Sequence, residues 1–96
     1  MGAYNLLNAS KETIQRGDTY FELEEGLLIE SRVTKVSEIH MNYEALNGKI
    51  LGSSQFSGLS GFAINRRGGT LNVIVGNIDD TKTDVLETIL SERGLI

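Results

Sequence analysis

Small hydroxyl residues and two adjacent arginines form the part of this sequence that is best suited to bind an anion. Residues 52–61 are rich in serine and glycine, and a pair of arginines follows a few positions later. Backbone N–H groups and hydroxyls in such a loop can cradle a phosphate or carboxylate, and guanidinium groups bind these anions through paired hydrogen bonds. The candidate ligand-binding residues are therefore Ser53, Ser54, Ser57, Arg66 and Arg67.

The same stretch does not match the familiar phosphate-binding motifs. A phosphate loop closes with Gly-Lys-Ser or Gly-Lys-Thr and a dinucleotide site carries G-x-G-x-x-G, and neither pattern occurs in the chain. An ordinary surface connection is the alternative interpretation. Phe56, Leu59 and Phe62 favour a further use, because a purely solvated loop has no need of large apolar side chains. We expect these three residues to contact a protein partner or a second copy of the chain.

Other groups that could do chemistry have simpler structural explanations. Asp79, Asp80 and Asp84 could bind a hard cation, but the calcium-loop pattern is absent and helix capping accounts for all three. His40 is the only histidine, lies between polar residues and is expected to be exposed. The chain has no cysteine and no G-x-S-x-G motif, so no nucleophile–base pair is recognisable. We expect no metal site, no cofactor and no catalytic residue.

A basic and aromatic face is the alternative that would bind nucleic acid. The residues that could gather on one face of a sheet are Arg16, Arg32, Lys35, Lys49 and Arg66, with Tyr20, Phe21 and Tyr43 for stacking. A small barrel with such a face would bind single strands. However, six glutamates between residues 22 and 44 occupy the same region and would repel phosphates. A solvated surface of mixed charge is therefore preferred, and we expect no nucleic-acid partner.

Length and composition set the remaining limits. The chain has 96 residues, a net charge of -4 and 40% hydrophobic residues, which suits one small globular domain over residues 1–96. The absence of cysteine fits a cytoplasmic protein, and the first residues lack the positive start and long apolar stretch of a signal peptide. No apolar run is long enough to cross a membrane. Because so small a domain has a thin stability margin, self-association would stabilise it.

The C-terminal third predicts a hairpin followed by a helix. Residues 61–65 and 70–76 have the composition of strands, and the glycines between them suit a tight turn. Asp80 or Thr81 is expected to cap the helix, and Gly94 to end it. One apolar face of the helix is expected to pack on the second strand. The residues involved are Val85, Leu86, Ile89 and Leu90 on the helix, and Leu71, Val73 and Val75 on the strand.

Alternating apolar residues predict strands in the middle of the chain. The first runs over residues 19–24, where Phe21 and Leu23 alternate with Tyr20, Glu22 and Glu24. Glu25-Gly26 is the turn into the β-branched run over 27–36. Residues 39–45 continue the alternation, and Asn47-Gly48 is typical of a hairpin that would return through residues 49–51.

A helix is the alternative interpretation of one segment and the predicted structure of another. A helix that begins at Ser37 and ends at Asn47-Gly48 is the alternative to the strand over 39–45, because Met41, Glu44 and Leu46 are good helix formers. Near the N-terminus, sparse apolar residues between 3 and 16 predict a short helix that Gly17 would end.

Together these elements predict an α+β fold. We expect a mainly antiparallel sheet of about five or six strands, the C-terminal helix across one face and a short N-terminal helix. The function expected is a small non-enzymatic binding module, a homo-oligomeric accessory or inhibitor-type protein. Its partner would be a protein or a small phosphorylated ligand. Small-barrel nucleic-acid binding is the first alternative, and an enzyme that uses carboxylates and the arginine pair is the last.

Overall fold

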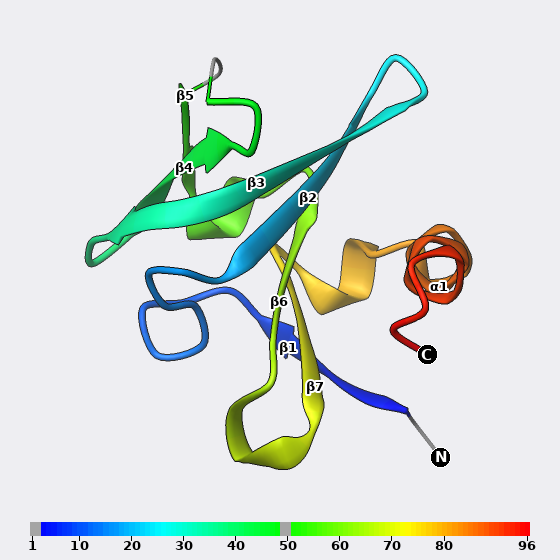
Figure 1. Ribbon diagram of the computed structural model, residues 1–96. Coiled ribbons are helices and arrows are strands. Elements are labelled where there is room, and N and C mark those ends of the chain that lie inside the picture. The colour runs from blue at the N-terminus through cyan, green and yellow to red at the C-terminus, as the bar shows by residue number, and fades with distance from the viewer. Residues whose placement is uncertain (1–2, 49–50) are drawn as a thin grey trace.

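A computed structural model describes residues 3–48 and 51–96 and shows an α+β fold with one mixed sheet. Figure 1 shows the C-terminal helix on one side of the sheet. The strands are β1 (Tyr4–Asn8), β2 (Thr19–Glu24), β3 (Leu27–Val36), β4 (His40–Ala45), β5 (Leu51–Gln55), β6 (Phe62–Asn65) and β7 (Leu71–Val75). The described residues form the helix α1 (Thr83–Glu92) and the short 3-10 turns η1 (Phe56–Gly58), η2 (Arg67–Gly69) and η3 (Ile78–Asp80).

The described part of the sheet contains seven strands, where we predicted five or six. Their order is β1-β7-β6-β2-β3-β4-β5, and every neighbouring pair is antiparallel except β1 and β7, which are parallel. The mainly antiparallel character is confirmed. The additional strand is β1, which extends the sheet beyond β7 and makes it mixed.

The predicted N-terminal helix is wrong, because residues 4–8 form the edge strand β1. Leu6 packs into the cluster on the helix side of the sheet, whereas Leu7 packs into the cluster on the other side. Adjacent side chains that point to opposite faces are typical of a strand and not of a helix. Beyond β1 the chain makes one turn, in which the Ile14 N–H donates to the Ser10 carbonyl at 3.1 Å. Ile14 is fully buried there.

The two faces of the sheet carry separate hydrophobic clusters. On the helix side, Leu71, Val73 and Val75 of β7 pack with Phe21, Phe62 and the helix, as predicted for the strand and for three of the four helix residues. The exception is Val85, which is 46% exposed, so its placement in the core was wrong. The second cluster contains residues from five strands and the two connections that cover them: Ile14, Tyr20, Val33, Met41, Phe56, Ala63 and Ile74.

The segment with two alternative interpretations is the strand β4. It pairs with β3 on one side and with β5 on the other, and Met41 and Ala45 are buried. A helix could not make both ladders, so the strand prediction is confirmed. The return from the turn at Gly48 begins in the structure at Leu51, opposite Glu44, while residues 49–50 of the predicted strand lie outside the described residues.

Helix α1 begins later than predicted and ends where predicted. Residues 78–80 form the turn η3, which the Asn77 side chain caps by accepting from the Asp79 N–H at 3.0 Å. Lys82 occupies the N-cap position of α1, so the predicted capping by Asp80 or Thr81 is wrong. At the other end, Gly94 has φ 73° and the Leu95 N–H donates to the Leu90 carbonyl at 2.8 Å. This is the left-handed helix end expected from glycine.

Among the described residues, no helix has the length and apolar character needed to cross a membrane.

Candidate functional site

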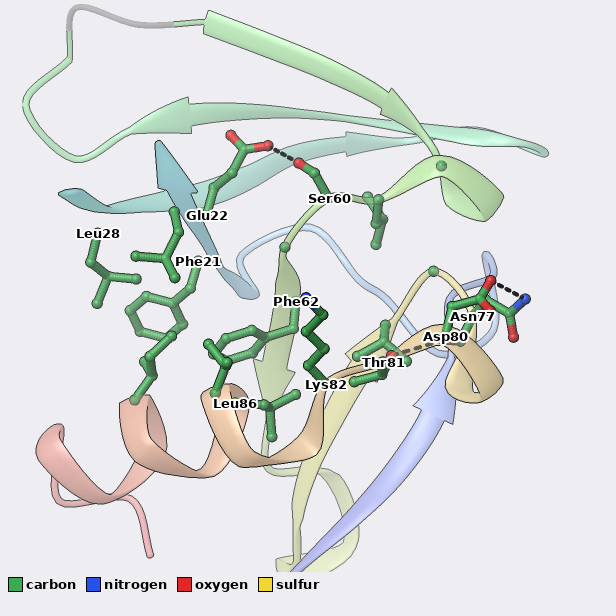
Figure 2. A pocket seen from close by; sticks show the side chains of 18 of the residues that line it. Phe21, Glu22, Leu28, Ser60, Phe62, Asn77, Asp80, Thr81, Lys82 and Leu86 are labelled. Atoms are coloured by element: carbon green, nitrogen blue, oxygen red, sulfur yellow. Dashed lines mark hydrogen bonds between the residues drawn. The ribbon is translucent and has the colours of Figure 1, made fainter. Parts of the chain in front are cut away.

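A groove of about 430 Å³ opens between α1, β2 and the connection formed by residues 57–61. Figure 2 shows side chains from these three segments, and from the end of β7 and η3, around the groove. A second hollow, beside Thr19 and Asn65, has about 250 Å³, and the elements that form the larger groove are far apart in sequence.

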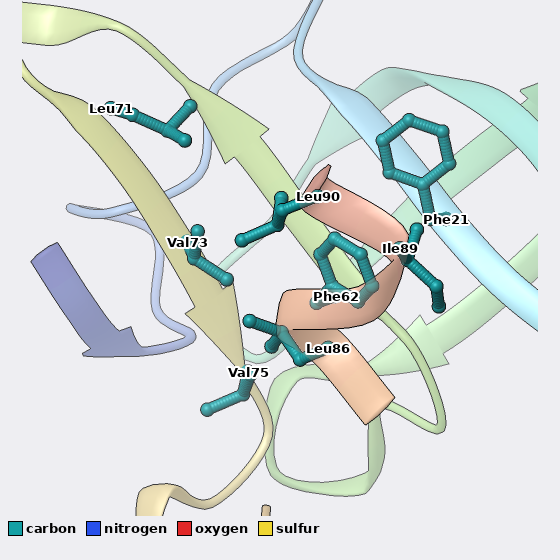
Figure 3. Packing of buried hydrophobic residues seen from close by; sticks show 8 residues of the cluster. All are labelled: Phe21, Phe62, Leu71, Val73, Val75, Leu86, Ile89 and Leu90. Carbon is teal, nitrogen blue, oxygen red and sulfur yellow. The ribbon is translucent and has the colours of Figure 1, made fainter. Parts of the chain in front are cut away.

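The floor of the groove is apolar and rigid. Phe21 and Phe62 lie side by side with ring centroids 5.4 Å apart, and both rings are almost completely buried. Leu86 reaches the same floor from the helix. These three residues belong to the cluster in Figure 3, so packing on the sheet fixes the shape of the floor. A floor that is part of the core needs no ordering when a ligand binds.

Two aliphatic side chains on the rim remain half exposed. Leu23 at the end of β2 is 47% exposed and Val85 on α1 is 46% exposed, and both line the groove. They stand on opposite walls, since one comes from the sheet and the other from the helix. A ligand between them would remove apolar surface of both from water.

One wall is held by a polar network that joins residues 57–61 to β2. The Ser60 hydroxyl donates to the Glu22 carboxylate, and the Gly61 N–H donates to the Tyr20 hydroxyl at 3.0 Å. Burial raises the pKa of Tyr20 to about 12, so this phenol keeps its proton. A Cβ on residue 61 would lie 1.8 Å from the Phe21 carbonyl oxygen, so only glycine allows the connection to approach β2 this closely.

The opposite wall is formed by the turn before α1. The Asn77 amide donates to Asp80 at 3.1 Å, and the Thr81 hydroxyl donates to the Asn77 carbonyl at 2.8 Å. Lys82 also lines this wall and forms no ion pair within residues 3–48 and 51–96. The rim therefore presents two carboxylates, from Glu22 and Asp80, and one ammonium group.

Inside the groove, the edge of β2 has a backbone position with which no strand pairs in the described part of the chain. β6 pairs with β2 only at Thr19, Tyr20 and Phe21, whereas β2 continues to Glu24. In an antiparallel ladder the bonding direction alternates, and the two-residue turn makes Glu24 a bonded partner of Leu27 in β3. The Leu23 N–H and carbonyl consequently point away from β3, toward the space where β6 would continue.

The predicted serines are separated by the structure. Ser57 lines the groove, whereas Ser53 and Ser54 lie in β5 at the far end of the sheet. β2, β3 and β4 lie between β5 and β6, a separation of roughly 19 Å at the usual strand spacing. Ser53 and Ser54 therefore cannot close around one anion with the arginines of the β6–β7 turn.

The two arginines have different surroundings. The Arg67 guanidinium donates to the Thr13 carbonyl at 2.8 Å and pairs with Asp18 at 2.9 Å, which ties the β6–β7 turn to residues 10–18. Arg66 is exposed and borders a second, shallower hollow beside Thr19 and Asn65. Arg67 thus has a structural partner already, and the geometry gives no support to the predicted arginine pair as a unit.

The three predicted interaction residues also separate. Phe56 is only 5% exposed and packs in the second cluster, on the face away from α1. Leu59 and Phe62 line the groove, with Phe62 in the floor. No pattern in the sequence marks Leu23 as a site residue, and the helical spacing of Val85 predicts that it lies in the core. Helical periodicity assigns Val85 to the apolar face but does not show that β6 begins only at Phe62 and leaves the end of β2 uncovered.

Metal ligands are not gathered in the part of the chain that the structure describes. No group of three or more His, Cys, Asp or Glu side chains is placed there to hold a metal ion. Asp79 and Asp80 lie in η3, and Asp84 lies in the first turn of α1. The expected absence of a metal or cofactor stays a prediction.

Comparisons with models of protein families, with curated proteins and with solved structures found no match. The geometry of the groove is therefore the evidence for a function.

Proposed function

We propose that this protein is a small non-enzymatic binding module that holds an extended, apolar segment of a partner protein in the groove between α1 and β2. The observation that carries the proposal is a preformed hollow of about 430 Å³ with a buried aromatic floor and half-exposed aliphatic walls. Sites that recognise ligands are concave, mainly apolar and bordered by a few polar groups.

The unused edge of β2 favours an extended partner. An added strand would pair with Leu23 where β6 stops, and its alternate side chains would point to the groove floor. Backbone hydrogen bonds of this kind give affinity without requiring a particular sequence, and the apolar floor selects the side chains. Covering Leu23 and Val85 would add about 1 kcal/mol each, since half of each side chain is still in water.

Charged residues on the rim of the groove would orient the partner segment. Glu22 and Asp80 lie on the β2 and η3 sides of the groove, and Lys82 lies at the start of the helix. Charges on a rim mainly set the direction and the rate of association. A partner segment with a basic residue on either side of its apolar residues would match the two carboxylates.

The other expected ligands have less support. A phosphorylated ligand would have to attract Arg67 away from Asp18 and Thr13. Of the three aromatic residues expected to stack on nucleic-acid bases, Tyr20 and Phe21 are buried, at 0% and 3% exposure, and only Tyr43 is partly exposed. The accessory or inhibitor role and the cytoplasmic location stay predictions from the sequence.

A library of random linear peptides displayed on phage tests the proposal. The wild-type chain serves as bait, and peptides that bind the support without the protein are removed. We expect enriched peptides with alternating apolar residues, whose addition shifts the amide NMR signals of residues around the groove. Val85→Glu and Leu23→Glu should each weaken binding at least about tenfold, because both place a charge against an apolar ligand.

Ile39→Glu is the matched control, since Ile39 is 63% exposed and does not line the groove. It should leave peptide affinity unchanged. The proposal is wrong if no peptide is enriched, or if the enriched peptides bind the two groove variants as well as they bind the wild type.

A further inference from the structure

β5 ends the sheet on the side away from the groove and has one open edge. It is the outermost strand in the sheet order, and its pairing partner is β4. Leu51, Ser53 and Gln55 are exposed, and Leu51 is 78% exposed. Figure 1 shows β5 at the margin of the fold, far from α1.

The backbone of Ser53 points to this open edge. The Phe56 N–H donates to the Ile39 carbonyl at 2.9 Å, which fixes the bonding direction at the end of β5. Because that direction alternates along an antiparallel ladder, Ser54 and Gly52 bond to β4, and Leu51, Ser53 and Gln55 face outward. Among the described residues, no hydrogen bond occupies the Ser53 N–H or carbonyl.

β5 lacks the usual protection against pairing with another strand, although its outward Gln55 carbonyl already accepts one bond, from the Ser54 hydroxyl at 3.0 Å. Proteins usually guard such an edge with a charge, a proline or a bulge. β5 has no charged residue and no proline, and its register with β4 is continuous, in contrast to the shift between Val33 and Lys35 in β3. The other edge strand, β1, is anchored at both ends, where Tyr4 donates to Glu87 and Asn8 accepts from the Ile78 N–H.

We propose that β5 pairs antiparallel with β5 of a second copy of this chain, about a twofold axis at Ser53. A strand that contains an outward-facing residue at its centre is self-complementary, because the axis then pairs all five residues. Leu51 would lie opposite Gln55 of the second copy, and Ser53 opposite Ser53. The chain carries a net charge of -4, but this strand is neutral, so two copies can meet here without bringing like charges into contact.

A second copy explains the exposed leucines better than a charged partner does. Leu46 at 56% exposure and Leu51 at 78% lie at the same end of the β4–β5 hairpin. Pairing would extend the sheet across the axis and shield part of this apolar surface. Five residues form a small interface, below the size of a standard specific complex, so we expect a dissociation constant on the order of 10 µM. β5 does not line the groove, so this inference is independent of the proposed function.

Sedimentation velocity of the full chain between about 2 and 500 µM tests the inference. The wild type should pass from 10.5 kDa to twice that mass as concentration rises. Ser53→Lys and Ser53→Glu should each raise the dissociation constant at least about fivefold, because each places two like charges opposite each other at the axis. An equimolar mixture of the two variants should dimerise again, since the charges across the axis are then opposite.

Ser53→Ala is the matched control and should dimerise like the wild type, because the proposed pairing uses the backbone of residue 53. Ser53→Pro removes the outward N–H without touching the bonds to β4, and should be monomeric with an unchanged circular dichroism spectrum. A wild type that stays monomeric at 500 µM, or a dimer that persists in Ser53→Lys and Ser53→Pro, overturns the proposal. Dissociation by Val85→Glu but not by the Ser53 variants overturns it too, since self-association would then use the groove.

Discussion

Replacing Asp18 by alanine is expected to destabilise the protein by about 3 kcal/mol, because three donors converge on one nearly buried carboxylate. The Asp18 side chain is 9% exposed. Its Oδ2 accepts from the Gln15 N–H at 2.8 Å, from the Asn65 amide at 2.8 Å and from the Arg67 guanidinium at 2.9 Å. These bonds connect the segment after β1 to the β6–β7 turn.

The magnitude follows from the unequal exposure of the two charges. Removing one partner of a buried pair costs about 3–5 kcal/mol. Arg67 is 33% exposed, so water solvates part of the guanidinium that loses its partner, and the lower end of the range applies. For a domain of this length, 3 kcal/mol corresponds to a fall in melting temperature of about 15 °C.

Thermal and urea unfolding followed by circular dichroism measures the effect. The same measurements are made on Arg67→Ala and on the double variant of Asp18 and Arg67. Asp79→Ala is the control, since Asp79 is an exposed aspartate outside this network. The double variant should lose at least about 1 kcal/mol less than the sum of the two single variants, because both remove the same interaction. A fall of less than about 3 °C for Asp18→Ala, or simple additivity, would refute a structural role for the ion pair.

Three further predictions concern the core, the groove wall and pH. Leu90→Ala should lower the free energy of unfolding by about 2–5 kcal/mol in urea titrations, since Leu90 is fully buried between helix and sheet. Gly61→Ala should cost about 2 kcal/mol or more and shift the amide NMR signals of residues 57–61, because the added methyl group meets the Phe21 carbonyl. Tyr20 should ionise at a pKa of about 12 in an absorbance titration, against 10.0 for a free phenol. Because unfolding lowers this pKa, the stability contributed by Tyr20 should be complete below pH 10 and lost as pH rises toward 12, and a flat stability over that interval would contradict it.

The candidate site could be predicted only in part from the sequence. The serines, glycines and isolated apolar residues of the stretch 52–61 predicted a binding site there. Ser57, Leu59 and Phe62 from this region do line the groove. The anion site predicted from the same stretch does not form. Its serines and arginines are close in sequence, but Ser53 and Ser54 lie in β5, whereas the arginines lie at the β6–β7 turn. Three strands lie between the middle of β5 and the strand that leads into the β6–β7 turn.

Local physics explains the elements that the sequence determined by itself. Glu25-Gly26 adopts positive φ at both positions, as a two-residue hairpin turn requires, and Gly94 ends α1 in the same left-handed region. Alternation of apolar residues was sufficient to predict β2, β4 and β7 as strands. It did not show that β2 and β7 are buried on both faces, where Tyr20, expected on the polar side, and Ile74 pack in the second cluster. The turns and the strand assignments depend on neighbours in the chain and can be read without the fold.

Tertiary structure alone decided the rest. Residues 4–8 form a strand because they pair with the open edge of β7. The partners are distant in sequence, since Asn5 lies opposite Asn72, 67 residues later. Val85 was left half exposed because β6 begins at Phe62 and leaves the end of β2 uncovered, and that same shortfall forms the groove. In both cases the outcome depends on where a distant strand begins or ends, which no local pattern encodes.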